Sequence, residues 1–337
     1  AVEWYLTRRG TPSQSIEYIH HLHMSGDTEG LAEALSDEGH SLVRSGHIEL
    51  LGILRSLDVS NFGPRTSFVI HELRGDILSI QGKWEEAVGE YDAAMPLALK
   101  HKMTAPLARL LSSRADLAVK RGEMDEALSL HRKALEIQIS VRDALGAARS
   151  YNNMGYIFRR QRDNKRALEV YGNVEELLDA EGSPELTEAR IRLASAFLEM
   201  GEMDRARDHA MIAHDETEEN EQIRLHARSR AVLGRYYAKI KDNDLAMHHY
   251  SGALEILSDQ PDPHSAVEVE MLLGQVLSDA GRADEAAEHY LDGLALAEAN
   301  DFRMMQGEIL SRLGEVESNR SQRMDYLQRS LVVFREL

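Results

Sequence analysis

Gly75, the run Gly82-Lys83-Trp84-Glu85-Glu86-Ala87, Tyr91 and Ala94 form the pattern that decides the fold of this 337-residue chain. The pattern returns with a small residue at its first position, a turn near its middle and an alanine, often with a tyrosine, near its end. The steps between first positions are 40, 40, 39, 40, 40 and 40 residues. Such a period is typical of a stacked repeat array rather than of two globular domains. The small residues that mark the first positions are Gly75, Ala115, Gly155, Ala194, Gly234, Gly274 and Gly314.

Each repeat has the composition of two antiparallel helices. The small residue in the first helix and the alanine in the second let the two helices approach closely. The glycine between them ends the first helix, and the acidic residue that follows favours the start of the second. We expect Tyr91, Tyr171, Tyr250 and Tyr290 to fill the seam between one pair and the next. Because each pair leaves an apolar face that only its neighbour covers, the sequence predicts an all-α solenoid.

Prolines mark the predicted joints between helix pairs. Pro106, Pro184, Pro261 and Pro263 lie where one pair should end and the next begin. Pro96 is the exception, because it lies where a second helix should still be running. Proline has no backbone N–H and its ring clashes with the preceding turn, so we expect a kink or an early helix end there.

The repeat at residues 148–171 carries a family pattern most fully. It reads Ala148-Arg149-Ser150-Tyr151-Asn152-Asn153-Met154-Gly155-Tyr156, and continues with Arg166-Ala167-Leu168-Glu169-Val170-Tyr171. It resembles the tetratricopeptide (TPR) repeat family, in the variety with about 40 residues per unit. The resemblance covers residues 66–337 and implies a right-handed superhelix of antiparallel helix pairs. We expect a TPR solenoid over residues 61–337, with about seven units and a degenerate C-terminal one.

Residues 1–60 do not keep the period and are expected to form a helical cap segment. Their pattern predicts helices at Ser15–Ser25, Thr28–Ser45 and His47–Leu57. With the runs at residues 18–27 and 32–35, the segment is similar to the start of the sensor arm in STAND-type signalling ATPases, such as the bacterial maltose-regulon activator. That resemblance implies a nucleotide-binding domain and a winged helix before residue 1, and hence that the chain is a piece of a longer protein.

The amino-acid composition excludes some kinds of site and argues against some kinds of binding partner. The chain has no cysteine, which excludes disulfides, thiolate zinc sites and cysteine nucleophiles and suits a reducing cytoplasm. Its net charge of -18 argues against a general role in binding nucleic acid or anionic membrane. No apolar run approaches the length of a bilayer span. We therefore expect a cytoplasmic protein whose partner is a protein, a peptide, possibly acidic, or a small anionic effector.

Sequence motifs that are typical of catalytic and metal-binding sites are incomplete in this chain. A phosphate-binding loop needs a glycine, four residues and then Gly-Lys-Ser or Gly-Lys-Thr, whereas Gly82 and Lys83 are followed by Trp84. His71-Glu72 begins like a zinc-protease helix, but Gly75 stands where the second histidine belongs. The pairs among His20, His21 and His23, and His248, His249 with Asp244, lack further ligands and are interpreted as packing or solvated side chains. We expect no catalytic residue, no metal and no cofactor.

The family resemblance implies that partners bind on the concave face, which is lined by the first helix of each pair. At the 24 positions that it assigns to this face in the four central units, nine residues are basic and three are acidic. The whole chain has 39 basic and 57 acidic residues, so the basic ones are concentrated on this face. The candidate binding residues are Arg109, Lys120, Arg149, Asn152, Asn153, Tyr156, Arg159, Arg160, Arg192, Arg228, Arg235 and Lys239.

Two interpretations of these residues remain open. In the first, they form an electropositive trough in which Arg159 and Arg160 bind carboxylate or phosphate groups. Asn153 occupies the position at which adaptors similar to kinesin light chain bind a peptide backbone, and Asn152 adds a second amide. In the second, the arginines bridge to acidic residues of neighbouring helices. The flanking units are acidic and are expected to confine binding to the middle of the array; their acidic residues are Glu72, Asp76, Glu268, Asp279, Glu308 and Glu315.

Two function classes follow from the same residues. One is a regulatory sensor arm that binds an effector in the trough and changes the state of an attached ATPase. The other is a free-standing adaptor that captures acidic peptide segments of partner proteins. Neither class is an enzyme within these 337 residues.

Overall fold

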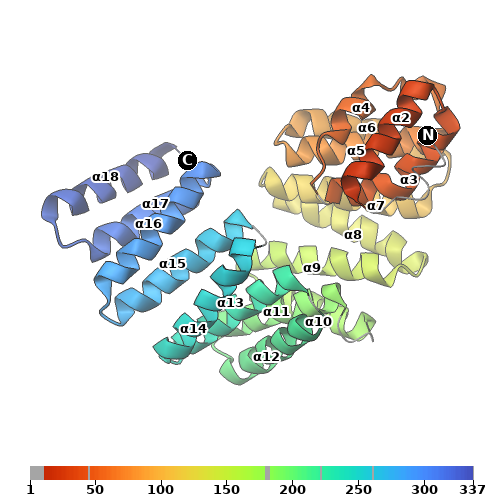
Figure 1. The fold of residues 1–337 in the computed structure, drawn as a ribbon. Helices are drawn as coiled ribbons and strands as arrows, with labels where there is room; N and C mark the ends of the chain where they lie inside the picture. The colour runs from red at the N-terminus through yellow and green to blue at the C-terminus, as the bar shows by residue number, and fades with distance from the viewer. Residues whose placement is uncertain (1–10, 45, 179–182, 221, 260–261, 337) are drawn as a thin grey trace. The chain divides into compact units, whose positions relative to one another are not determined.

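The computed structural model describes residues 11–44, 46–178, 183–220, 222–259 and 262–336. Within these ranges the chain contains α-helices and one short 3-10 helix and no strand, which confirms the predicted all-α solenoid class. None of the described helices is long and apolar enough to cross a membrane. The chain divides into two compact units, residues 1–157 (unit 1) and 158–337 (unit 2), which are described separately (Figure 1).

Unit 1 begins with cap helices and continues into the repeats. The cap consists of α2 (Pro12–Ser25), α3 (Thr28–Arg44), α4 (Leu50–Ser56) and the 3-10 helix η1 (Val59–Asn61). These bounds lie close to the predicted ones, although Ser45, the predicted end of the second helix, is outside the described residues. Two complete pairs and most of α9 follow: α5 (Pro64–Ile80) with α6 (Trp84–Lys100), α7 (Thr104–Lys120) with α8 (Met124–Ser140), and α9 (Ala144–Arg160).

Unit 2 continues the array from the last turn of α9. The first helices of the pairs begin at residues 64, 104, 144, 184, 223, 263 and 303 across both units, so the period read from the sequence is the period of the helices. The helices are α10 (Asn164–Leu177), α11 (Pro184–Met200) with α12 (Met203–Glu219), α13 (Ile223–Lys239) with α14 (Asn243–Asp259), α15 (Pro263–Asp279) with α16 (Ala283–Ala299), and α17 (Arg303–Val316) with α18 (Arg320–Glu336).

The described prolines at the joints lie where they were predicted, and Pro96 lies inside α6. Pro184 and Pro263 are the first residues of α11 and α15, and Pro106 lies in the first turn of α7, whereas Pro261 is outside the described residues. At Pro96, where a kink or an early end was expected, the helix does not end early, because α6 continues to Lys100. Pro96 and Asp92, whose carbonyl loses its helical partner, are both exposed, so water can bind that carbonyl.

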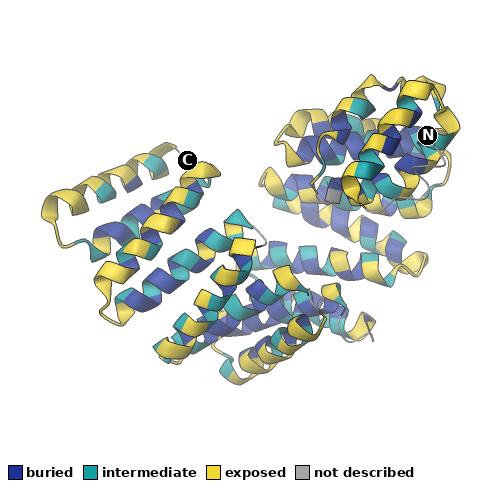
Figure 2. Cartoon of the chain, in the orientation of Figure 1, coloured by how far each residue is buried: buried dark blue, intermediate teal, exposed yellow. Residues whose placement is uncertain are grey.

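Buried tyrosines pack on the small residues of the first helices, and buried positions run along the facing sides of paired helices (Figure 2). A Cβ atom added at Gly234 would lie 2.6 Å from the ring of Tyr250, and one at Gly274 would lie 2.6 Å from the ring of Tyr290. Each ring thus sits on the glycine of its own pair. Only a residue without a side chain leaves room for the ring there. The other end of the ring reaches the following pair, in keeping with the expected position between pairs, since the Tyr290 hydroxyl interacts with Arg312 on α17.

The turns inside the pairs require a left-handed backbone. Gly82, Gly122, Gly201 and Gly281 have φ between 74° and 80° at the end of a first helix. The corresponding residues of two other pairs are Arg162, with φ 61°, and Lys241, with φ 64°. The left-handed backbone conformation costs a residue with a Cβ atom about 1–2 kcal/mol, so these two turns are strained relative to the others.

We therefore expect Arg162→Gly to stabilise unit 2 by about 0.5–1 kcal/mol, because relief of strain exceeds the added flexibility of the unfolded chain. The change in urea midpoint measures this effect. As a control, Glu169→Gly in the exposed interior of α10 should destabilise by about 1 kcal/mol. Equal losses for both variants would contradict the strained turn.

Candidate functional site

The candidate residues lie on the surface of the first helices. We call this surface the first-helix face: α5, α7 and most of α9 in unit 1, and the end of α9 with α11, α13, α15 and α17 in unit 2. Consecutive first helices contact each other in both units, as α5 contacts α7 and α13 contacts both α11 and α15. Side chains about one repeat apart in sequence therefore lie side by side.

In unit 1 a buried carboxylate holds the first candidate arginine. Glu72 on α5 is 0% exposed and accepts hydrogen bonds from Arg109 Nε at 2.7 Å and Arg109 Nη2 at 2.8 Å. His40 Nε2 lies 2.8 Å from the same carboxylate. Burial alone would raise the pKa of Glu72, but the hydrogen bonds from His40 and Arg109 outweigh it and lower the pKa. Arg109 is therefore part of an ion pair between α5 and α7.

Two further unit 1 candidates form hydrogen bonds with the preceding pair. Asn153 Nδ2 donates to Asp116 Oδ1 at 2.9 Å, and Lys120 Nζ donates to Ser79 Oγ at 3.0 Å. Asn152 is only 4% exposed, which corrects the expectation that its amide faces a partner: on α9 it points into the packed side of the helix. Arg149 is exposed and Tyr156 is half-buried.

One carboxyl of unit 1 has an unusual proton affinity. Asp76 Oδ1 accepts a hydrogen bond from the Tyr91 hydroxyl at 2.7 Å. Burial and the nearby charge of Glu72 raise the pKa of Asp76 to about 6. With Glu72, Asp76 and Asp116 beside Arg109, Lys120 and Arg149, these positions of the unit 1 face carry no net charge when all six groups are ionised.

In unit 2 two arginines share Glu188. Glu188 Oε1 accepts from Arg192 Nη2 at 2.6 Å, one helical turn away, and from Arg228 Nη1 at 2.9 Å, one repeat away on α13. The side chain of Arg192 is 15% exposed. Burial alone would raise the pKa of Glu188, but the charges of Arg192 and Arg228 outweigh it and lower the pKa to about 2. Glu188 is thus ionised at any physiological pH.

A second carboxylate of unit 2 links three first helices. Glu199 on α11 forms an ion pair with Arg159 on α9, and Arg235 Nη2 on α13 lies 3.8 Å from the same oxygen. Lys239 and Arg160 are exposed. We call the basic patch the set Arg159, Arg160, Arg192, Arg228, Arg235 and Lys239 together with Glu188 and Glu199; it has six basic and two acidic residues, an excess of four positive charges.

Ion pairs of the candidate arginines bear on the two interpretations. Arg109, Arg159, Arg228 and Arg235 contact a carboxylate on a neighbouring helix, and Arg192 contacts one on its own helix, so bridging between neighbouring helices does occur. In unit 1 the bridges leave no net charge, whereas in unit 2 the basic patch keeps a positive excess. On α15 and α17 the face becomes acidic, with Glu268, Asp279, Glu308 and Glu315.

The i,i+4 pair of Glu188 and Arg192 was expected from the sequence and is present, but the partners about one repeat away were missed. Glu72 was assigned only to an acidic flank, although it binds Arg109, which is 37 residues later. Glu188 and Arg228 are separated by 40 residues, and Arg159 and Glu199 by 40 residues. An acidic and a basic residue about one repeat apart on first helices is the signal that would have revealed these pairs.

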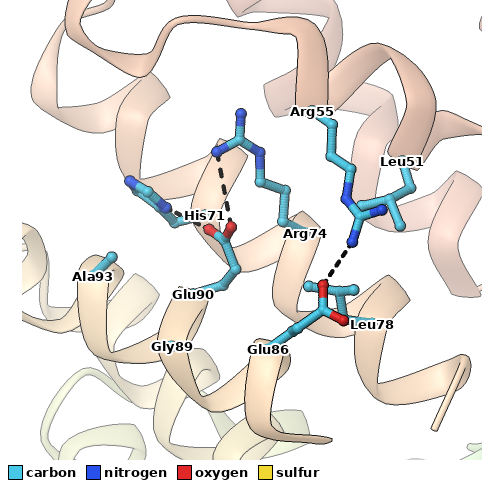
Figure 3. A pocket seen from close by; sticks show the side chains of 9 residues that line it. All are labelled: Leu51, Arg55, His71, Arg74, Leu78, Glu86, Gly89, Glu90 and Ala93. Carbon is cyan, nitrogen blue, oxygen red and sulfur yellow. Dashed lines mark hydrogen bonds and ion pairs between the residues drawn. The ribbon is translucent and has the colours of Figure 1, made fainter. Parts of the chain in front are cut away.

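A cavity of about 330 Å³ lies where the cap meets the first pair (Figure 3). Arg74 closes the end of α4, because its guanidinium donates to the Leu54 carbonyl at 3.1 and 2.5 Å and to the Leu57 carbonyl at 3.0 Å. The other charged walls are paired with each other, Arg55 with Glu86 at 2.7 Å and His71 with Glu90 at 2.6 Å (Figure 3). These contacts hold α4 on the array.

Of the histidines singled out in the sequence, His249 packs against other aromatic rings, whereas His20 and His21 are exposed. Among the described residues no group of three or more histidine, aspartate, glutamate or cysteine side chains is placed to hold a metal ion. His249 stacks on Tyr237 at a centroid distance of 5.3 Å and meets His214 edge-on at 6.0 Å. Burial, helped by the nearby charge of Arg230, lowers the pKa of His249 to about 4. At neutral pH this ring is uncharged and packs between helices.

Comparison with known families matches two stretches of the chain to one kind of repeat. Two family models, both described as tetratricopeptide repeat, match residues 106–180 and 271–329. Among curated proteins, the 43 kDa receptor-associated protein of the synapse from Tetronarce californica is 27% identical over 141 residues, which is 42% of this chain and 34% of that protein. The chain thus aligns with about a third of this relative.

Solved structures share the fold at low sequence identity. A signal transduction ATPase with numerous domains (STAND) and a tetratricopeptide repeat sensor, from Pyrococcus horikoshii, matches 98% of this chain and 51% of its own, with TM-score 0.70 and 14% identity. The quorum sensor NprR from B. thuringiensis matches 96% of this chain and 87% of its own, with TM-score 0.66 and 12% identity. The Rap conjugation gene regulator of plasmid pLS20, in complex with the Phr* peptide, matches 96% and 95%, with TM-score 0.64 and 13% identity.

Proposed function

Because this chain is built of tetratricopeptide repeats, which form protein-interaction modules, we propose that it is a non-catalytic module that binds an effector or partner on its first-helix face. The proposed site is the basic patch of unit 2. We further propose that the module is the regulatory sensor arm of a larger STAND-type signalling ATPase, and that it works in the cytoplasm, where such an ATPase finds its nucleotide.

The observation that carries the site is the charge left after pairing. The basic patch keeps an excess of four positive charges, in a chain whose net charge is -18. Four of its arginines, Arg159, Arg192, Arg228 and Arg235, are held in place by Glu188 and Glu199, so their guanidinium groups are ordered before a ligand arrives, which reduces the entropic cost of binding. Ordered guanidinium groups bind carboxylate and phosphate by two parallel hydrogen bonds. An anionic peptide segment or effector fits this patch.

The sensor role is supported by the STAND likeness. The fold of the Pyrococcus horikoshii ATPase matches 98% of this chain with about half of its own length, and its name describes its repeats as a sensor. The cap helices α2 to α4 are consistent with the start of such an arm. The alternative is a free-standing adaptor that binds acidic peptide segments, and the peptide complex of the pLS20 Rap regulator favours this alternative.

A charge reversal tests the site. The variant Arg160→Glu with Lys239→Glu changes two exposed residues of the basic patch, and Lys165→Glu with Arg207→Glu makes the same charge change on the second helices α10 and α12. We expect the first variant to bind a fluorescein-labelled Gly-Glu-Glu-Leu-Glu-Glu-Gly peptide roughly tenfold more weakly, since each reversed contact is worth up to about 1 kcal/mol. The control variant should bind like the native chain.

Fluorescence anisotropy at about 0.05 M and 0.2 M salt measures this binding, and the affinity should fall with salt because exposed charges are screened. Equal weakening by both variants, or none by either, would remove the basic patch as the site. The mass of the native protein in its own cells separates the two roles. A mass far above 37.9 kDa favours the sensor arm, and a mass near that value favours the adaptor.

A further inference from the structure

The first-helix face of unit 2 also contains a cavity of about 400 Å³ between α15 and α17. Its apolar walls are Met271 and Leu272 on α15 and Met305 on α17. Met271 is buried, whereas Leu272 and Met305 are partly exposed at the opening. Methionine side chains are flexible and polarisable, so two of them adapt to apolar groups of different shape. The volume lies within the range of about 300–1,000 Å³ that is typical of ligand sites.

The polar residues around this cavity are not evenly distributed. At one end Arg312 donates to the side-chain oxygen of Gln275, which joins α17 to α15. The guanidinium of Arg312, which is partly exposed, also interacts with the Tyr290 hydroxyl. Glu268 and Glu308, one from each helix, are exposed on the rim beside His264. The opening is therefore apolar inside and acidic outside.

We propose that this cavity receives one large aliphatic or aromatic side chain of an extended peptide, with lysine or arginine residues on either side that contact Glu268 and Glu308. Burial of the apolar side chain against the methionines supplies the attraction. The two carboxylates select the sign of the flanking charge, because an acidic neighbour would be repelled. The proposal rests on the proposed function in that both place a peptide on the first-helix face.

This site extends the first-helix face beyond the basic patch. The acidic flanks were expected to confine binding to the middle of the array, but Glu268 and Glu308 instead complement a ligand of opposite charge. Unit 2 thus offers two subsites of opposite sign on its first helices: the basic patch on α9, α11 and α13, and this cavity on α15 and α17. The apolar–basic motif is the ligand of the second subsite.

Two labelled peptides and two charge-reversal variants of the full chain test the proposal. The probe is fluorescein-labelled Gly-Lys-Lys-Leu-Lys-Lys-Gly, and the same peptide with serine in place of leucine is its apolar control. The variant Glu268→Lys with Glu308→Lys should bind the probe at least tenfold more weakly than the native chain in fluorescence anisotropy. The matched variant Glu288→Lys with Asp292→Lys, on the exposed side of α16, should bind it like the native chain.

Comparison of the leucine and serine peptides measures the contribution of the apolar side chain to binding. The serine peptide should bind at least tenfold more weakly than the leucine peptide, and Leu272→Ala should remove most of that difference. Circular dichroism checks that each variant is folded. The proposal is overturned if the leucine peptide does not bind, if the serine peptide binds equally well, or if the α15–α17 and α16 variants weaken binding equally.

The acidic peptide used for the basic patch separates this proposal from the proposed function. Its affinity should be unchanged in the Glu268→Lys, Glu308→Lys variant or slightly improved, and should fall in the Arg160→Glu, Lys239→Glu variant. If only the acidic peptide binds, the basic patch stands and the α15–α17 subsite is rejected. If only the basic peptide binds, the reverse holds.

Discussion

Gly234→Ala should destabilise unit 2 by about 2–3 kcal/mol, although alanine is the better helix former. The added methyl group would lie 2.6, 2.7 and 2.9 Å from three carbons of the Tyr250 ring, well inside van der Waals contact. Tyr250 is 1% exposed and is held from all sides, so the ring cannot move away without disturbing its neighbours. Urea denaturation followed by circular dichroism measures the loss.

Two further variants show whether the ring is the cause. Gly172→Ala, also in a helix of unit 2, places its methyl group where no atom lies within 4 Å, so it should be neutral or stabilise by up to about 1 kcal/mol. Tyr250→Leu combined with Gly234→Ala should cost less than the sum of the two single changes, because the smaller side chain leaves room for the methyl group. Strict additivity would contradict the proposed clash.

Glu188→Gln should destabilise unit 2 at pH 7 by about 3 kcal/mol, because it removes the charge that compensates Arg192 and Arg228. Glutamine has nearly the same size as glutamate, so the loss of stability measures the effect of the charge rather than of packing. Glu176→Gln, an exposed residue of α10, serves as the control and should change the stability by less than about 0.5 kcal/mol.

The pH dependence gives the same prediction a second readout. The folded pKa of Glu188 is about 2, below its ordinary value of 4.5, so the carboxylate stabilises the fold above pH 4.5 and loses this effect as the pH falls towards 2. The difference in unfolding free energy between the native chain and Glu188→Gln should therefore shrink between pH 4.5 and 2. A difference that stays constant over this range would show that the charge is not responsible.

The fold was predictable because its determinants are local and repeated. Gly234 precedes Tyr250 by 16 residues and Gly274 precedes Tyr290 by 16, so the ring and the position that accommodates it occur within one helix pair. A pattern that returns every 40 residues can be read without any knowledge of tertiary structure. The packing of the tyrosine ring on the glycine of its own pair was not predicted, because the spacing alone does not show which residue the ring contacts.

The site was predictable only in part. The positions of the arginines on the first helices followed from the family pattern, but their partners depend on side-chain conformations across two pairs. Arg192 shows the difference: the sequence places it beside Glu188 on one helix, whereas its burial depends on how α11 packs. Asn152 was misplaced for a related reason, since a single residue step turns a helical side chain by about 100°.

The contacts that join first helices also bear on how such a chain changes its length. Arg228 and Glu188 are 40 residues apart, Asn153 and Asp116 are 37 apart, and Arg312 and Gln275 are 37 apart, so each bond joins equivalent parts of successive repeats. Duplication or loss of one whole repeat in the gene brings equivalent helix faces together again. Gain or loss of one residue inside a first helix rotates the rest of that face by about 100° and separates the partners. Changes in copy number are therefore the length changes that this architecture tolerates.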